Sequence, residues 1–207
     1  MSNISDYIIP VNYGNGVIVG DIFITASHVY DKDSSYISFN IDRDSYRFSS
    51  KDAILHLYCT DKERTDDFLF NDVSIYRLNK RYNNLSFDTS LPNVGDIIQS
   101  ISLKHTVKQN SNNIDNPGIF YNRPTESYEC ITSKATISNI KGNFIFCNME
   151  PALEKGRSGS PLVHNNRVVG ILHAGFENEE NIEDNGKLCV FQSISSIKSM
   201  LEENGIL

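Results

Sequence analysis

The sequence lacks several features that define other classes of protein. Among its 207 residues there is no tryptophan, and no apolar run approaches the roughly 20 residues of a membrane-spanning helix, so we expect no membrane insertion. Basic residues are outnumbered, 19 Lys and Arg against 26 Asp and Glu, and the net charge of −7 argues against nucleic-acid binding. The first residues contain neither a positively charged start nor a long apolar stretch. We therefore expect no secretory signal and a cytoplasmic protein.

The four cysteines also lack the paired spacing of zinc sites and redox motifs; they are Cys59, Cys130, Cys147 and Cys189. An even number permits two disulfides, but each cysteine stands in an apolar, strand-like context, which favours buried free thiols. Neither H-E-x-x-H nor paired C-x-x-C motifs are present, so we predict no metal and no organic cofactor.

The chain does contain a regular series of short apolar segments separated by turns. Segments such as Tyr36–Ile41 and Val94–Leu103 alternate apolar and polar residues, as half-buried strands do, and Tyr13–Gly16 has turn composition. Only Ser193–Asn204 has apolar residues at helical spacing, and Gly205 follows as a C-terminal cap. The sequence therefore predicts an all-β barrel or sandwich with one closing helix.

The most distinctive stretch is Gly156–Leu162, with the sequence G-R-S-G-S-P-L, in which Ser158 precedes a glycine and closely follows another. Glycines let the main chain turn tightly and approach a bound carbonyl group. The N–H groups of such a turn can converge on one point, as an oxyanion hole requires. A G-x-S-G string is equally compatible with an ordinary loop. A catalytic serine also needs a base and an orienting acid elsewhere in the chain.

Candidates for both groups precede the serine. His28 ends the stretch Gly16–His28, two apolar runs around a Gly-Asp turn, and histidine has the pKa of a general base near neutral pH. Asp72 opens the alternating strand Asn71–Leu78. Three rival carboxylates lie in the charged loop before it but do not open an apolar strand: Asp61, Asp66 and Asp67. The order His, Asp, Ser is one that known serine peptidases use.

These motifs resemble those of the trypsin/chymotrypsin-fold serine peptidases, most closely the bacterial HtrA-like and glutamyl-endopeptidase-like types. Thr25–His28 is similar to the family's T-A-A-H, and Asn71–Ile75 to its D-[IL]-A-[VL]-L. Gly156–Pro161 is similar to its G-[DN]-S-G-[GS]-P. The resemblance implies two six-stranded antiparallel Greek-key barrels, one in residues 1–88 and one, with the closing helix, in residues 89–207.

The resemblance also implies a role for each residue. Ser158 would attack a peptide carbonyl, His28 would serve as general base and then acid, and Asp72 would orient His28. The backbone N–H groups of Gly156 and Ser158 would form the oxyanion hole. Arg157, between them, would face solvent or the side of the leaving group.

The walls of the primary substrate pocket would include Ala152, His173, Ala174 and Gly175. Trypsin-like enzymes keep an aspartate at the place of Ala152, so we expect no strong preference for Lys or Arg. Glutamyl endopeptidases bind the substrate with a histidine in Gly-x-His, whereas this chain has Gly170-x-x-His173. An offset of one residue on a strand reverses the side chain's face. His173 could therefore line the pocket, face Asp72 or simply pack.

We therefore expect a serine endopeptidase that acts on protein or peptide substrates and is restrained by a regulatory partner or by a loop. The Asn- and Ser-rich segment Lys108–Pro117 is a candidate for such a loop. The alternative is a catalytically inactive relative on the same fold that binds peptides or partners. The complete set of candidate groups argues against it. A cysteine-nucleophile hydrolase is disfavoured because no cysteine has a Gly-flanked loop context.

Overall fold

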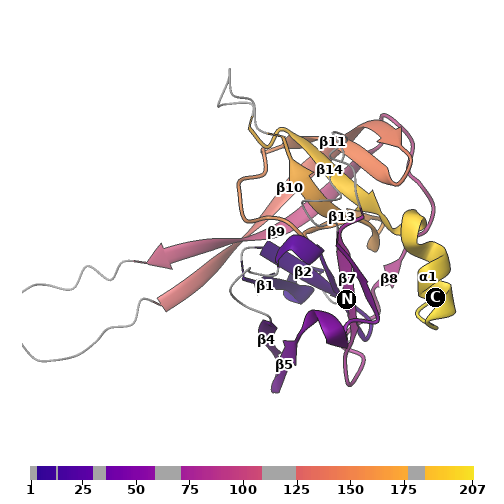
Figure 1. Ribbon diagram of the computed structural model, residues 1–207. Coiled ribbons are helices and arrows are strands. Elements are labelled where there is room, and N and C mark those ends of the chain that lie inside the picture. The colour runs from indigo at the N-terminus through magenta and orange to yellow at the C-terminus, as the bar shows by residue number, and fades with distance from the viewer. Residues whose placement is uncertain (1–3, 13, 30–35, 59–70, 109–124, 177–184) are drawn as a thin grey trace, which may run out of the picture.

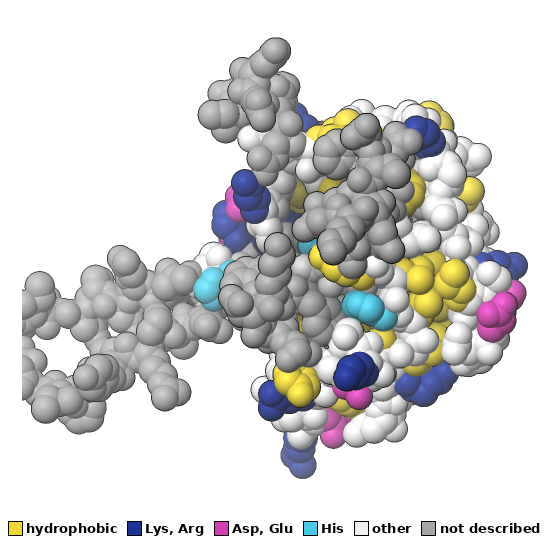
Figure 2. Space-filling model, viewed as in Figure 1, with side chains coloured by type: hydrophobic (Ala, Val, Ile, Leu, Met, Phe, Trp, Pro, Cys, Tyr) yellow, Lys and Arg dark blue, Asp and Glu magenta, His cyan; other side chains and the backbone are white. Residues whose placement is uncertain are grey.

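The computed structural model describes six stretches of the chain, drawn as ribbon in Figure 1: residues 4–12, 14–29, 36–58, 71–108, 125–176 and 185–207. They form β-strands, apart from short helical turns and one α-helix close to the C-terminus. No helix in these stretches is long and apolar enough to cross a membrane. On the face drawn in Figure 2, the described Lys and Arg side chains are scattered rather than gathered in one patch. The predicted all-β fold with one closing helix is confirmed.

The N-terminal half forms an antiparallel sheet of five strands in the order β1-β2-β3-β7-β6. The strands are β1 (Ile8–Val11), β2 (Gly14–Val19), β3 (Ile22–Thr25), β6 (Leu55–Leu57) and β7 (Val73–Arg77). A separate hairpin consists of β4 (Ile37–Ile41) and β5 (Asp44–Phe48). Where the sequence predicts one six-stranded barrel, the described residues thus form a five-stranded sheet and a hairpin. The connecting residues 30–35 and 59–70 lie outside the described stretches.

Strands β2 and β3 are buried on both faces, because successive side chains of a strand point in opposite directions into two different hydrophobic clusters. Val17 and Ile24 belong to a cluster that also contains Ile101 from the C-terminal half. Ile18 and Phe23 belong to a cluster made entirely of residues from the N-terminal half. One side of the N-terminal sheet therefore packs directly against the other half of the chain.

The C-terminal half forms a closed antiparallel barrel of six strands in the order β12-β9-β10-β11-β14-β13, with β12 pairing back onto β13. The strands are β9 (Ile97–Lys108), β10 (Thr125–Lys141), β11 (Phe144–Glu150), β12 (Pro161–His164), β13 (Arg167–Gly175) and β14 (Leu188–Ser193). The short strand β8 (Ser86–Phe87) pairs with β13 in parallel. β8 precedes the predicted boundary at residue 88 but belongs to the C-terminal sheet.

Strands β9 and β10 extend beyond the barrel as a two-stranded ribbon (Figure 1). The sequence predicts two strands, Tyr128–Thr132 and Ala135–Ile140, where the structure has the single strand β10. Pairing with β9 continues without interruption from Thr125 to Thr136, so the polar Ser133 and Lys134 do not break the strand. Continuous ladder hydrogen bonds therefore outweigh the local turn propensity of these two residues.

The chain ends in a helix that packs against both halves. It begins as the 3-10 turn η5 (Ile194–Ile197) and continues as α1 (Lys198–Glu203), with Gly205 at φ +65° closing it as predicted. Further 3-10 turns are η1 (Ile4–Tyr7), η2 (Ser27–Val29) and η3 (Ser50–Asp52). η2 is the turn that carries His28.

Candidate active site

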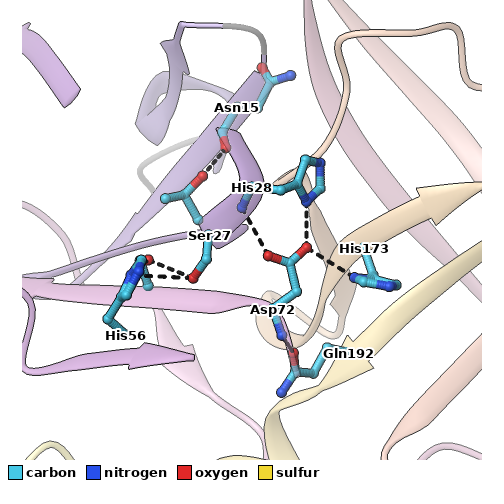
Figure 3. Close-up of polar contacts among 9 residues, drawn as sticks. Asn15, Ser27, His28, His56, Asp72, His173 and Gln192 are labelled. Atoms are coloured by element: carbon cyan, nitrogen blue, oxygen red, sulfur yellow. Dashed lines mark hydrogen bonds and ion pairs between the residues drawn. The ribbon is translucent and has the colours of Figure 1, made fainter. Parts of the chain in front are cut away.

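His28 and Asp72 meet at the ends of two neighbouring strands of the N-terminal sheet. Strands β3 and β7 are antiparallel neighbours with Thr25 opposite Ser74, so the residues after β3 and before β7 lie at the same end of the two strands. Asp72 Oδ2 accepts a hydrogen bond from His28 Nδ1, and Oδ1 accepts one from the backbone N–H of His28 at 2.9 Å (Figure 3). The side chain of His28 is 32% exposed and that of Asp72 is 0% exposed. The imidazole is thus open to a ligand while its carboxylate partner is shielded.

Asp72 accepts a third hydrogen bond, from His173 Nδ1 at 3.0 Å (Figure 3). Its backbone N–H donates to Gln192 Oε1 at 2.8 Å, and Gln192 Nε2 donates to Asn71 Oδ1 at 3.1 Å. Burial by itself raises the pKa of Asp72, but the hydrogen bonds from His173 and His28 outweigh burial and hold this pKa well below its ordinary value. The carboxylate is therefore charged at neutral pH and firmly held.

The loop that carries Ser158 fits closely against β2. The backbone N–H of Asn15 donates to Ser158 O at 2.7 Å. Gly159 has φ +83°, and a Cβ on it would lie 1.9 Å from Asn15 O. Only glycine fits such a position, both for its backbone angle and for lack of space.

The same contacts place Ser158 beside the turn that carries His28. A Cβ on Gly14 would lie 2.5 Å from Ser158 O and 2.6 Å from Cγ1 of Val29, the residue after His28. On the other side, Gly159 N–H donates to Leu172 O at 2.9 Å, and the next residue on β13 is His173. The loop that carries Ser158, η2 and β13 therefore converge, so that Ser158, His28 and Asp72 lie in the same region of the molecule.

The N–H groups of Gly156 and Ser158, the expected oxyanion donors, have no acceptor among the described residues. Gly156 has φ +81° and lies two residues before Ser158. Neither the N–H of Gly156 nor that of Ser158 donates a hydrogen bond to another residue that the structure describes. Both groups can therefore donate to a ligand.

Asn15 is a residue beside the Ser158 loop that the sequence analysis missed. It is 0% exposed, its Oδ1 accepts from Leu103 N at 3.0 Å, and its Nδ2 donates to Gly156 O at 3.2 Å. The side chain thus links the N-terminal sheet to β9 and to the loop that carries Ser158.

The sequence predicts a turn at Tyr13–Gly16, whereas Gly14–Gly16 belong to β2, and Tyr13 lies outside the described residues. The glycines allow neighbouring groups to pack closely against the backbone of β2, because a Cβ on Gly16 would lie 2.3 Å from the Phe23 ring.

His173 faces Asp72, which is one of the alternatives left open by the sequence, and is only 6% exposed. The register of β13 against β14 shifts between Leu172 and Ala174, so His173 is the extra residue of a β-bulge. A bulge re-aims the side chain, and simple alternation along the strand therefore does not predict its direction.

A cavity of about 640 Å³ lies next to Ser158. Its apolar walls include Leu153, Leu172, Phe176 and Cys189. Of the four residues that the resemblance assigns to the primary pocket, Gly175 lines this cavity; its described lining does not include the other three, Ala152, His173 and Ala174. Asp61, Asp66, Asp67 and most of Lys108–Pro117 lie outside the described residues.

His28, Asp72 and His173 also form the one group of potential metal ligands among the described residues. Asp72 Oδ2 and His173 Nδ1 are 3.0 Å apart and hydrogen-bonded. Ligands of a tetrahedral zinc ion with bonds of about 2.0 Å are separated by about 3.3 Å. The spacing thus matches a hydrogen-bonded network better than a zinc site.

The N-terminal sheet and the closed C-terminal barrel form a chymotrypsin-like fold. Solved structures share this fold. Mouse neuropsin, a serine protease, is 16% identical, with a TM-score of 0.61 over 97% of this chain and 95% of that one. The scabies mite inactivated protease paralogue S-D1 is 12% identical, with a TM-score of 0.60 over 100% and 96% of the two chains. A second paralogue, S-I1, is 14% identical, with a TM-score of 0.58 over 98% and 96%.

At the level of sequence, residues 2–201 match the protein family described as Trypsin, so the chain belongs to the trypsin family. A comparison with curated proteins finds no match.

Proposed function

We propose that this protein is a serine endopeptidase that hydrolyses peptide bonds through His28, Asp72 and Ser158. The observation that carries the proposal is the buried Asp72 carboxylate, which holds the partly exposed His28 imidazole beside the serine loop. A role in stability alone does not explain why a partly exposed histidine is held in this way, because exposed ion pairs contribute little to stability. A general base, in contrast, needs a fixed tautomer and orientation.

The chemistry follows from this geometry. Because Nδ1–H of His28 donates to Asp72, the neutral ring carries its lone pair on Nε2. Nε2 takes the proton of Ser158 Oγ as Oγ bonds to the substrate carbonyl carbon, and the N–H groups of Gly156 and Ser158 stabilise the oxyanion. Nε2 then gives the proton to the leaving amine, and water hydrolyses the acyl-enzyme by the same route.

No hydrogen bond joins Ser158 Oγ to His28 in the described structure, which holds no substrate. Catalytic hydrogen bonds are often long or misaligned in free enzymes and shorten when the substrate binds.

We further propose that the cavity beside Ser158 takes an uncharged, apolar side chain preceding the cleaved bond. Leu153, Leu172, Phe176 and Cys189 supply apolar walls. The described lining of this cavity contains no aspartate such as the one with which trypsin-like enzymes select basic side chains.

An inactive peptide-binding protein on the same fold remains the second candidate, because two of the similar structures are inactivated paralogues. Against it, this chain retains His28, Asp72 and Ser158 together with the N–H groups of Gly156 and Ser158, which donate to no other described residue. An inactivated relative has no chemical need for this set.

The thiols and the motifs support two finer proposals. Cys147 and Cys189 face each other across β11 and β14 as free cysteines, which supports a reducing, cytoplasmic location. The motifs at Thr25–His28 and Gly156–Pro161 support a bacterial HtrA-like or glutamyl-endopeptidase-like subtype. We also propose that the enzyme is restrained until a regulatory partner binds, so that the purified chain cleaves peptides slowly; full, constitutive activity of the purified chain would contradict this restraint.

Digestion of a defined peptide mixture, with products identified by mass spectrometry, tests the endopeptidase proposal. The unaltered chain is expected to cut internal bonds after apolar residues, and Ser158→Ala is expected to leave every peptide intact. Equal products from both proteins would trace the cleavage to a contaminant. Binding without cleavage by the unaltered chain would favour the inactive peptide-binding protein.

A further inference from the structure

A second cavity, of about 830 Å³, lies on the other side of the segment Glu154–Arg157 from the cavity beside Ser158. Both cavities include this segment in their walls, so it separates them. The second cavity lies between the two halves of the chain. Asn12 and Gly14 line it from the N-terminal half, and Lys104 and Tyr128 from the β9–β10 ribbon.

Arg157 lines both cavities, and its guanidinium group lies beside Glu154, whose carboxylate also binds Lys104 in the wall of the second cavity. Arg157 is only 3% exposed, which contradicts the expectation that it faces open solvent. Its Nη2 lies 3.5 Å from Glu154 Oε2, the one hydrogen bond that it makes within the described part of the chain. Guanidinium offers five N–H donors, so most of them make no hydrogen bond to the described residues.

The carboxylate of Glu154 is shared. Its Oε1 accepts a hydrogen bond from Lys104 Nζ at 2.7 Å, a much shorter contact than the one to Arg157. A buried cation without a close anion is unfavourable. Burial lowers the pKa of Arg157 by more than the charges of Glu154 and Glu129 raise it. Among the described residues, the guanidinium therefore has one ion-pair partner, Glu154, which lies 3.5 Å away and also binds Lys104.

A peptide substrate would pass both cavities. Its reacting carbonyl would lie at the N–H groups of Gly156, which lines both cavities, and of Ser158, which lines the first. The residue before the cleaved bond would occupy the cavity beside Ser158. An extended chain would then bring the following residues to the second cavity.

We propose that the second cavity binds an acidic side chain of the substrate, located within the first three residues after the cleaved bond, and that Arg157 is its receptor. The proposal rests on the proposed peptidase function for the direction of the peptide. Carboxylate and guanidinium can form two parallel charge-assisted hydrogen bonds, the strongest pairing available to either group.

The position of Arg157 in the loop adds a consequence for catalysis. Arg157 lies between Gly156 and Ser158, the residues that carry the two oxyanion donors. A carboxylate that fixes its side chain also fixes the peptide groups on either side. An acidic substrate is therefore expected to raise kcat in addition to lowering KM.

Peptide binding to Ser158→Ala protein tests the proposal without requiring catalysis. The probes are fluorescent peptides with a central leucine and either Glu or Gln at the first, second or third position after it, measured by anisotropy. At one position or more, the Glu peptide is expected to bind about tenfold or more tightly than the Gln peptide, because a hydrogen bond to a charged group contributes about 1.5–3 kcal/mol. Arg157→Gln in the same background is expected to abolish this preference, and Arg157→Lys to keep part of it.

Arg77→Gln is the matched control, since Arg77 is exposed and pairs with Asp21 away from both cavities. It is expected to leave the Glu preference intact. Equal binding of Glu and Gln peptides at every position, a preference that survives Arg157→Gln, or no binding of any peptide would each overturn the proposal. If Arg157→Gln fails to fold, the comparison of Glu and Gln peptides on the Ser158→Ala protein still decides. Failure of the unaltered chain to cleave peptides would count against the peptidase function and leave this binding result unaffected.

Discussion

Asn15 offers a sharp test of how the serine loop is held, because it is a positioning residue rather than one that touches substrate. Asn15→Ala removes the acceptor of Leu103 N–H at 3.0 Å and the donor to Gly156 O at 3.2 Å. Each buried group left without a partner costs about 1–3 kcal/mol, so we expect the free energy of unfolding to fall by roughly 2–4 kcal/mol. For a domain of this size that corresponds to a Tm lower by roughly 5–15 °C.

The same substitution is expected to slow acylation. Loss of a complete oxyanion donor lowers kcat by about 10²–10³. Asn15 acts through the Gly156 carbonyl, so a smaller loss of about tenfold, measured per folded molecule as the rate of inactivation by a fluorophosphonate, is expected.

Asn83→Ala is the matched control. Asn83 is also buried, and it donates to Ile18 O at 2.9 Å and accepts from Gly20 N at 2.8 Å, away from the serine loop. Its loss is expected to lower Tm comparably and to leave the rate per folded molecule unchanged. Equal rates for Asn15→Ala and the unaltered chain, or equal rate losses in both variants, would refute the reasoning.

Three further predictions follow from the site and the barrel. His173→Ala removes a charge-assisted hydrogen bond to Asp72 of about 1.5–3 kcal/mol, so we expect a lower Tm and a rate of inactivation by fluorophosphonate reduced about tenfold. His173→Ser restores a hydrogen-bond donor and is expected to rescue part of the rate. Identical kinetics of the Ala and Ser variants would contradict a hydrogen-bonding role. Because the pKa of Asp72 is lower in the folded than in the unfolded chain, its stabilisation is complete above the unfolded pKa and is lost as pH falls below about 4. Acid unfolding followed by circular dichroism should show this loss, and Asp72→Asn should flatten the pH dependence. Burial raises the pKa of Cys147 and of Cys189 to about 12, so neither thiol should react with Ellman's reagent until the protein unfolds, whereas the exposed Cys130 should react in the native state.

The sequence predicts the fold class and the catalytic candidates because both depend on local patterns. Alternating apolar segments predict the strands, and the small residues around Ser158 predict a tight loop whose Gly159 indeed has φ +83°. Asp72 can be chosen over its rivals because it alone opens an apolar strand.

The remaining features depend on contacts between distant segments. The direction of His173 depends on a bulge in the pairing of β13 with β14, which alternation along one strand does not reveal. The role of Asn15 depends on packing against a loop about 140 residues away in sequence. Arg157 lies at a cavity whose other walls come from the β9–β10 ribbon and the N-terminal half, far from it in sequence. The only local signal of the role of Asn15 is its place between two glycines, and this composition is equally typical of a turn.

The most direct test of the central claim is labelling by a fluorophosphonate, with the modified residue mapped by mass spectrometry. The account predicts a single adduct on Ser158, absent in Ser158→Ala, lost in His28→Ala and strongly slowed in Asp72→Asn, each shown by circular dichroism to be folded. Labelling of Ser158 at an unchanged rate in folded His28→Ala, or no labelling of the unaltered chain, would contradict an assembled catalytic triad.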